Sequence, residues 1–168
     1  GNPAGKADAI RGLIACPEWS GEPMQHVSYI TCHDNYCLRD RIDVSTKGEG
    51  RKIKGESEAT KLRMNKLAQT AVLVSQAMSF LYGGVELCRT KQGIDNSYQS
   101  PDSINIIPWE NKARYNELFA YYRAIIAIRH AHKGFRLGSA DAVREHVSFL
   151  PIENEQVIGY RIANLEGI

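Results

Sequence analysis

The sequence predicts an α/β fold with parallel strands, and three observations support this prediction. The apolar, β-branched run Val27–Cys32 is typical of a strand that is buried on both faces. A helical pattern follows over Leu62–Met78, and a second short apolar run comes directly after it at Met78–Tyr82. Strand, helix and strand in this order make a βαβ unit, in which the strands run parallel and the crossover is right-handed.

The composition is that of an ordinary globular domain. Of 168 residues, 43% are hydrophobic and 24% are charged, which argues against disorder and allows one buried core. The net charge of +2 gives no reason to expect nucleic acid, since glutamates dilute the basic residues between Lys47 and Lys66 and no aromatic residue lies among them. No apolar run reaches membrane-spanning length, so we expect no membrane partner.

The first residues show no recognisable targeting signal. The chain opens with Gly1 and has no signal-like segment, so we expect either an excised piece of a protein or targeting information elsewhere. The compartment stays unknown.

Around the first strand, a helix and an exposed loop are expected. Ala4–Ala15 suits a short helix, with Asn2 as its cap and Pro3 at its first position. Asp43–Glu58 is rich in glycine and charge, so we expect an exposed excursion there. In the crossover helix, small or apolar residues recur at helical spacing: Met64, Leu67, Ala68, Ala71, Val72 and Ser75.

Past the second strand, Gly83–Gly84 indicates a point that needs backbone freedom or a close approach by a ligand. The polar loop Gln92–Pro108 is long for a connection and is typical of a binding loop. A further helix is expected over Tyr115–His132, with Gly134 as its stop. Beyond Ala140, two alternating segments around a turn predict a hairpin that begins a β-rich module.

The four cysteines predict no metal site. Cys32 and Cys37 have a C-x4-C spacing, which lacks the second half of a zinc site. Because Cys32 lies in the expected strand, we expect a free, buried thiol there.

His33 and Asp34 are the candidate functional pair. They come together at the carboxyl end of the first expected strand, where α/β folds place ligand chemistry. A histidine and an aspartate at a strand end also commonly form a turn or a cap, so the residues alone leave both interpretations open.

Several longer motifs carry a resemblance to a known family. Val27–Asn35 resembles the last signature region of the α-amylase superfamily, glycoside hydrolase family 13. Ser75–Gly84, Cys88–Lys91 and above all Asn96–Asn105, followed by Trp109, are similar to its pullulanase branch, the type I debranching enzymes. The resemblance covers most of the chain between Gly12 and Phe135.

The resemblance implies a particular fold. The family fold is a (β/α)8 barrel, also called a TIM barrel, which needs about 250 residues. We therefore expect residues 1–140 to be the C-terminal fragment of such a barrel, with its last two strands and helices. Residues 141–168 are then expected to start a C-terminal β domain of the sandwich type.

The resemblance also implies roles for individual residues. Asp34 and His33 match the catalytic region, Asp34 as the family's third acidic residue and His33 as the histidine that binds the same sugar. The nucleophile and the general acid of the family lie on earlier strands, upstream of Gly1. The expected substrate-binding residues are Asn35, Tyr36, Asn96, Ser97 and Tyr98. Without the resemblance, the last three suit an Asx turn with a packed aromatic residue.

The implied activity is retaining hydrolysis of α-1,6 branch linkages in pullulan, glycogen or limit dextrins. The isolated chain is expected to be inactive, to need the missing N-terminal part of the same protein, and to self-associate through its open strand edges. Two alternatives stay open: a non-catalytic α-glucan-binding or assembly module, and an α-1,4-acting relative of amylase or neopullulanase. We expect no cofactor; the resemblance allows calcium but assigns it to no residue.

Overall fold

The computed structural model describes residues 5–47 and 56–163. Among these residues, no helix combines the length and the apolar character needed to cross a lipid bilayer. The chain divides into two compact units, and each unit is made of segments that are distant in sequence. Unit 1 comprises Gly1–Ser28, Ala71–Phe80 and Ile128–Ile168, and unit 2 comprises Tyr29–Thr70 and Leu81–Ala127.

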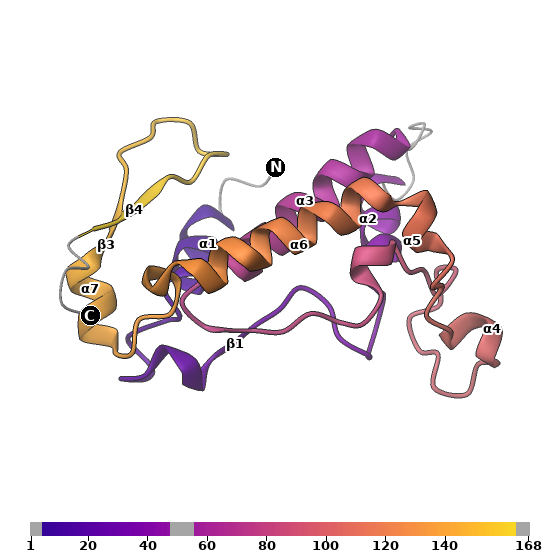
Figure 1. Cartoon of the computed structure of the whole chain (residues 1–168), viewed down its shortest axis with the longest axis horizontal. Coiled ribbons are helices and arrows are strands. Elements are labelled where there is room, and N and C mark those ends of the chain that lie inside the picture. The colour runs from indigo at the N-terminus through magenta and orange to yellow at the C-terminus, as the bar shows by residue number, and fades with distance from the viewer. Residues whose placement is uncertain (1–4, 48–55, 164–168) are drawn as a thin grey trace. The chain divides into compact units, whose positions relative to one another are not determined.

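The elements follow one another along the chain as Figure 1 labels them. In unit 1 they are α1 (Gly5–Leu13), η1 (Pro23–Gln25), β1 (Val27–Ser28), β2 (Met78–Ser79), η3 (Lys133–Phe135), α7 (Ala140–His146), β3 (Val147–Phe149) and β4 (Tyr160–Ile162). In unit 2 they are α2 (Leu38–Lys47), η2 (Val85–Leu87), α4 (Asp102–Asn105) and α5 (Asn111–Arg114). Two long helices contribute residues to both units: α3 (Glu58–Leu73) and α6 (Asn116–Ala131).

The predicted parallel pair of strands is confirmed. β1 pairs with β2 in parallel, with Val27 opposite Met78 and Ser28 opposite Ser79. The amide of Met78 donates to the carbonyl of His26 at 2.9 Å. Each strand is nevertheless only two residues long, whereas the sequence predicted strands over the whole of both apolar runs.

The prediction that these strands are buried on both faces is wrong. Val27 is 52% exposed, Met78 is 46% exposed and Phe80 is 41% exposed. Among the described residues, β1 and β2 pair only with each other, so neither strand has the flanking neighbours that bury a central strand in a parallel sheet. The apolar character of the runs is real, but in this chain it faces outward.

The crossover helix is confirmed, with shifted ends. Helix α3 begins at Glu58, four residues before the predicted start, because the hydroxyl of Ser57 caps it by accepting from the amide of Thr60 at 3.2 Å. The helix ends at Leu73 and not at Met78. The predicted apolar face is only partly correct, since Leu67 is 73% exposed.

The exposed excursion predicted at Asp43–Glu58 is wrong at its start. Residues 43–47 belong to α2, and residues 48–55 lie outside the described part of the chain. Asp43 forms ion pairs with two cations. Nε of Arg39 is 3.1 Å from its carboxylate, and Lys61 pairs with the same group. Arg39 also pairs with Glu58, which places α2 beside the start of α3 in unit 2.

Unit 2 has a mixed core. Its buried cluster consists of Leu38, Ile42, Val85, Cys88, Leu118 and Tyr122. The hydroxyl of Tyr122 donates to Oδ1 of Asn65 at 2.7 Å, and both residues are buried. Burial raises the pKa of the Tyr122 hydroxyl, so it stays a neutral donor. Helix α3 therefore packs against α6 in this unit partly through polar side chains, which the apolar pattern did not predict.

Unit 1 contains a buried arginine that bonds to backbone carbonyls. Arg129, only 8% exposed, donates to the carbonyls of Leu73, Ser75 and Ala77 at 2.9, 2.6 and 2.8 Å. Burial lowers the pKa of this guanidinium, but arginine keeps its charge in proteins. These three hydrogen bonds hold the connection between α3 and β2.

The predicted hairpin is confirmed. β3 and β4 pair antiparallel, with Val147 opposite Ile162 and Phe149 opposite Tyr160. Helix α7 before the hairpin was not predicted, although Ser139 caps it by accepting from the amide of Ala142 at 3.1 Å. The assignment of residues 141–168 to a separate β domain stays a prediction.

Candidate functional site

His33 and Asp34 lie side by side on an exposed loop of unit 2. Nε2 of His33 is 3.4 Å from Oδ2 of Asp34, and the two side chains are 80% and 74% exposed. They follow β1 after a four-residue loop, residues 29–32, and not directly as the sequence predicted, because the strand ends at Ser28. Asn35 then adopts a left-handed conformation, with φ +59°, which asparagine tolerates better than most residues.

A buried lysine forms hydrogen bonds with the backbone of this loop. Lys91 is fully buried, and its ammonium donates to the carbonyl of His33 at 3.3 Å and to the carbonyl of Asp95 at 3.0 Å. Asp95 immediately precedes the predicted binding residue Asn96. One side chain therefore links the backbone of the His33 loop to the backbone of the Asn96 loop.

Lys91 is itself positioned by Asp40, which lies in the first turn of α2. Asp40 is 3% exposed, and its carboxylate accepts from the amide of Lys91 at 2.6 Å and from the thiol of Cys37 at 2.9 Å. The hydroxyl of Thr90 donates to the other carboxylate oxygen. These bonds fix the segment from which the lysine reaches the two loops.

The Asn96 loop is closed by an asparagine at the end of α4. Oδ1 of Asn105 accepts from the hydroxyl of Ser97 at 2.9 Å, and its Nδ2 donates to the carbonyls of Ser97 and Ser100 at 2.8 and 3.1 Å. Ser97 is therefore buried and its hydroxyl is engaged within the loop, whereas Asn96 and Tyr98 are exposed, Tyr98 at 78%. The structure separates these three predicted residues into one that shapes the loop and two that face solvent.

Arg89 links the same loop to the glycine pair Gly83–Gly84. Its guanidinium donates to the carbonyls of Gly83 and Asn105 and lies 4.8 Å from the ring centroid of Tyr82. Gly84 has φ +94°, and a Cβ there would lie 2.9 Å from Cδ of Arg89. The predicted need for backbone freedom at this glycine pair is thus confirmed at Gly84.

Tyr36 lies half-buried just beyond the pair. The guanidinium carbon of Arg41 is 5.9 Å from its ring centroid, so one cation already contacts this aromatic ring. Its predicted role in binding stays a prediction.

Among the described residues, one group of three side chains brings metal-ligand atom types close together. Cys32, His33 and Asp34 each offer one ligand atom, and these atoms lie within 4.8 Å of one another. Calcium does not fit this set, because it takes six to eight oxygen ligands and the group supplies a single carboxylate. Cysteine spacing alone missed the group, since its members are consecutive residues of three different types. All four cysteines are free, and Cys32 is half-buried, not buried as predicted.

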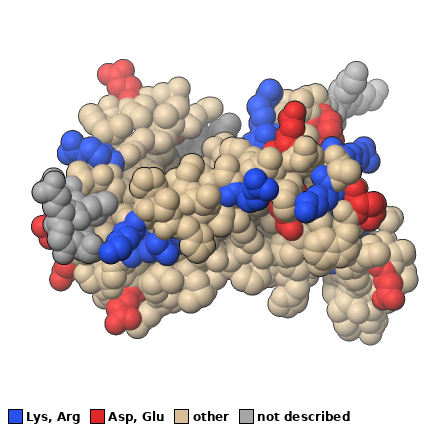
Figure 2. Space-filling view, viewed as in Figure 1, with Lys and Arg blue, Asp and Glu red and all other residues tan. Residues whose placement is uncertain are grey.

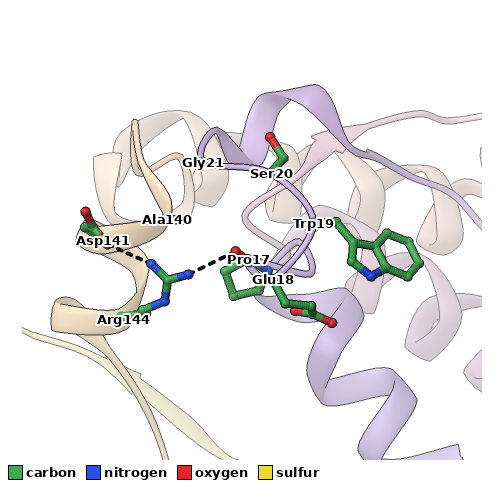
Figure 3. A pocket seen from close by; sticks show the side chains of 8 residues that line it. All are labelled: Pro17, Glu18, Trp19, Ser20, Gly21, Ala140, Asp141 and Arg144. Carbon is green, nitrogen blue, oxygen red and sulfur yellow. Dashed lines mark hydrogen bonds and ion pairs between the residues drawn. The ribbon is translucent and has the colours of Figure 1, made fainter.

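A separate hollow lies in unit 1 (Figure 3). It has a volume of about 360 Å³ and lies between residues 17–21 and the start of α7. Arg144 points into it but is already paired with Asp141 at 2.7 Å and donates to the carbonyl of Pro17 at 3.0 Å. None of the predicted site residues lines this hollow.

Charges of both signs are interspersed on the face shown in Figure 2, with acidic residues beside the basic ones. This distribution agrees with the small net charge of +2.

No family model matches the chain. Among curated proteins, it is similar to a pullulanase from Bacillus subtilis, with 32% identity over 100% of the chain and 23% of that protein. An isoamylase from a Flavobacterium species matches 68% of the chain at 23% identity, and the match covers 17% of that protein.

Solved structures give the same result. A crystal structure of type I pullulanase from Bacillus subtilis, complexed with maltose, matches 100% of the chain and 23% of its own length, with a TM-score of 0.91 and 32% identity. A pullulanase from Anoxybacillus, complexed with maltotetraose, matches 95% of the chain and 22% of its own length, with a TM-score of 0.87 and 36% identity. The chain therefore spans less than a quarter of the length of these relatives.

Proposed function

The chain is a pullulanase-like segment of the α-amylase superfamily, and from this premise we propose that it supplies part of the active site of an α-glucan debranching hydrolase. The proposed reaction is hydrolysis of α-1,6 linkages in pullulan, glycogen or limit dextrins with retention of configuration. The observation that carries the proposal is the exposed His33–Asp34 pair, held through its backbone by the buried Lys91.

Asp34 is proposed to assist the reaction and not to attack. A retaining glycosidase needs two carboxyl groups about 5 to 5.5 Å apart, one as nucleophile and one as acid. We assign both to sequence upstream of this chain, as the family resemblance implies. Asp34 then accepts hydrogen bonds from sugar hydroxyls, which strengthen as positive charge develops on the ring and so favour the transition state over the ground state. His33 donates to the same sugar.

The remaining predicted residues are proposed to line the glucan cleft. Asn35 and Asn96 offer amide groups to sugar hydroxyls, and Tyr36 and Tyr98 offer ring faces. Ser97 contributes indirectly, since its hydroxyl bonds to Asn105 and keeps the loop in shape. The link from Lys91 to both loops supports a shared role for the two groups of residues.

We further propose that β1 and β2 are the last two strands of a TIM barrel and that residues 141–168 begin a C-terminal β domain. The parallel pairing of β1 with β2 supports the first assignment. The antiparallel hairpin β3–β4 supports the second.

Two measurements on the purified chain test the proposal. Incubation with pullulan is expected to release no maltotriose, because the nucleophile and the acid are assigned upstream. Calorimetry with maltotriose at millimolar concentration is expected to detect weak binding that Asp34→Ala abolishes. Asp141→Ala, on the exposed start of α7, is the matched control and should bind as the unaltered chain does. Binding that survives Asp34→Ala would contradict the assigned site.

A second candidate is a glucan-binding module without catalysis, which the 78% exposure of Tyr98 favours. Joining the chain to the upstream sequence of its own protein distinguishes the two. Hydrolysis of pullulan by the joined protein supports the enzyme, and binding without hydrolysis supports the module. Among hydrolysis products, maltotriose indicates cleavage of α-1,6 linkages, whereas panose indicates the α-1,4-acting alternative.

Self-association is proposed for the isolated chain. Val27 and Met78 expose apolar side chains on two strands that pair only with each other within the described residues. Light scattering is expected to find a dimer or larger species, and a monomer over the whole accessible concentration range would contradict this.

A further inference from the structure

Two of the donor atoms in the Cys32–His33–Asp34 group already have the spacing that a tetrahedral metal requires. Nε2 of His33 lies 3.4 Å from Oδ2 of Asp34. With Zn–N and Zn–O bonds of about 2.0–2.2 Å, tetrahedral geometry places such a pair of ligands about 3.4 Å apart. The third donor, Sγ of Cys32, is within 4.8 Å of both.

We propose that Cys32, His33 and Asp34 bind a zinc-class divalent cation, with water in the fourth position. Thiolate, imidazole and carboxylate are the three ligand types that zinc takes in proteins. The same set disfavours magnesium and calcium, which prefer oxygen ligands throughout. The site goes beyond the proposed hydrolase, because metal binding needs neither the upstream carboxyl groups nor a glucan.

The backbone that presents these donors is fixed while the side chains stay accessible. Lys91 holds the carbonyl of His33, and Asn35 turns the chain directly after Asp34 with φ +59°. The side chains of His33 and Asp34 are mostly exposed, so both can rotate onto an ion from solvent. The conformational entropy lost on metal binding is therefore mainly that of three short side chains, because the loop backbone is already held in place.

The other three cysteines differ from Cys32 in burial or position, so a signal from the Cys32 thiol can be told apart from theirs. Cys37 is buried, its thiol bonds to Asp40 and to the carbonyl of Arg89, and burial raises its pKa to about 12. Burial also raises the pKa of Cys88. Both thiols are buried, and neither belongs to the Cys32–His33–Asp34 group. Cys16 is free and half-buried like Cys32, and it serves as the matched control.

Titration of the untagged chain with Co2+ tests the site, since cobalt replaces zinc with the same ligands and reports a bound thiolate through a charge-transfer absorption band. The unaltered chain and Cys16→Ser are expected to show the band, to bind one ion per chain and to lose the band when Zn2+ is added. Cys32→Ser should lose the band. His33→Ala, at an exposed position where misfolding is not expected, should weaken cobalt binding about tenfold or more.

Absence of the band from the unaltered chain would overturn the site, as would a band that persists in Cys32→Ser or disappears in Cys16→Ser. Circular dichroism of each variant confirms that the fold is kept. Because the titration contains no glucan, cobalt binding without maltotriose binding would count against the proposed hydrolase site and leave the metal site standing.

Discussion

The ammonium of Lys91 donates to the backbone carbonyl of His33 across 58 positions of sequence, at 3.3 Å. Lysine is rarely buried in proteins unless it is paired. Lys91 is buried, and its hydrogen bonds go to the backbone carbonyls of His33 and Asp95. These two hydrogen bonds link the loop that carries His33 to the loop that carries Asn96.

Replacing Lys91 by Met should destabilise the chain. The change keeps most of the apolar stem but leaves two carbonyls without a donor, at a cost of about 2 to 4 kcal/mol in the free energy of unfolding. Urea denaturation measures this cost. Lys112→Met, on the exposed surface, is the control and should change stability by less than about 0.5 kcal/mol. Equal stability of the two variants would show that the bonds to His33 and Asp95 contribute little.

Replacing Asp40 by Asn should also destabilise the chain. The buried carboxylate accepts from the amide of Lys91 and the hydroxyl of Thr90, and an amide offers one acceptor oxygen in place of two. The expected loss is about 1 to 3 kcal/mol in urea denaturation. Asp141→Asn, whose side chain is 95% exposed, should be close to neutral. A neutral effect at Asp40 would mean that Lys91 is positioned by other contacts.

Acid should destabilise the chain partly through Glu58. Its pKa lies below the ordinary value because Arg39 hydrogen-bonds to its carboxylate. A carboxyl whose folded pKa is lowered stabilises the fold above its unfolded pKa, about 4.3, and loses that contribution as the pH falls through the folded value. Glu58→Gln should therefore lose less stability than the unaltered chain between pH of about 5 and 3. Urea denaturation across that range measures it.

The control for this experiment is Glu117→Gln on the exposed surface of α6, which should follow the unaltered chain. If Glu58→Gln and the unaltered chain lose stability in parallel, the pair with Arg39 does not govern the acid response.

Tyr98 should matter for glucan binding and not for folding. Its ring is 78% exposed, so Tyr98→Ala removes little buried surface and should leave the unfolding midpoint within about 0.5 kcal/mol of the original. Maltotriose affinity measured by calorimetry should fall about tenfold. Trp19→Ala, another exposed aromatic residue at 71%, should leave affinity unchanged. A similar loss from both variants would indicate nonspecific stacking.

The order of β1, α3 and β2 and the parallel pairing of the two strands could be predicted from the sequence, because they follow from local patterns. The run before His33, the helical spacing from Leu62 and the second run at Met78 correctly predicted parallel strands joined by a helix. Burial was not accessible, because it depends on which neighbours cover a segment. Val27 is of a residue type that is usually buried, and it is nevertheless half exposed.

Within the candidate site, the sequence pointed to residues that the structure places in solvent, such as His33 and Asp34, but not to the buried residues that support them. His33 and Asp34 became candidates because they come together at the end of an expected strand and because the motif resembles a known one. Lys91 and Asp40 were missed because charged residues are predicted to be exposed unless a partner is known. The partners that link separate segments, His33 for Lys91 and Thr90 for Asp40, are distant in sequence. Asn105 was missed as the closing residue of its loop because the sequence pattern does not show that its amide bonds to Ser97 and Ser100.

The three carbonyls that receive hydrogen bonds from Arg129 belong to Leu73, Ser75 and Ala77, which alternate along the chain. Arg129 contacts only backbone atoms there, so its three hydrogen bonds do not depend on the side chains of Leu73, Ser75 and Ala77. Deleting or inserting one residue would instead turn the alternate carbonyls away from the planar guanidinium. The connection therefore depends on its length, because its three carbonyls must stay in register with Arg129.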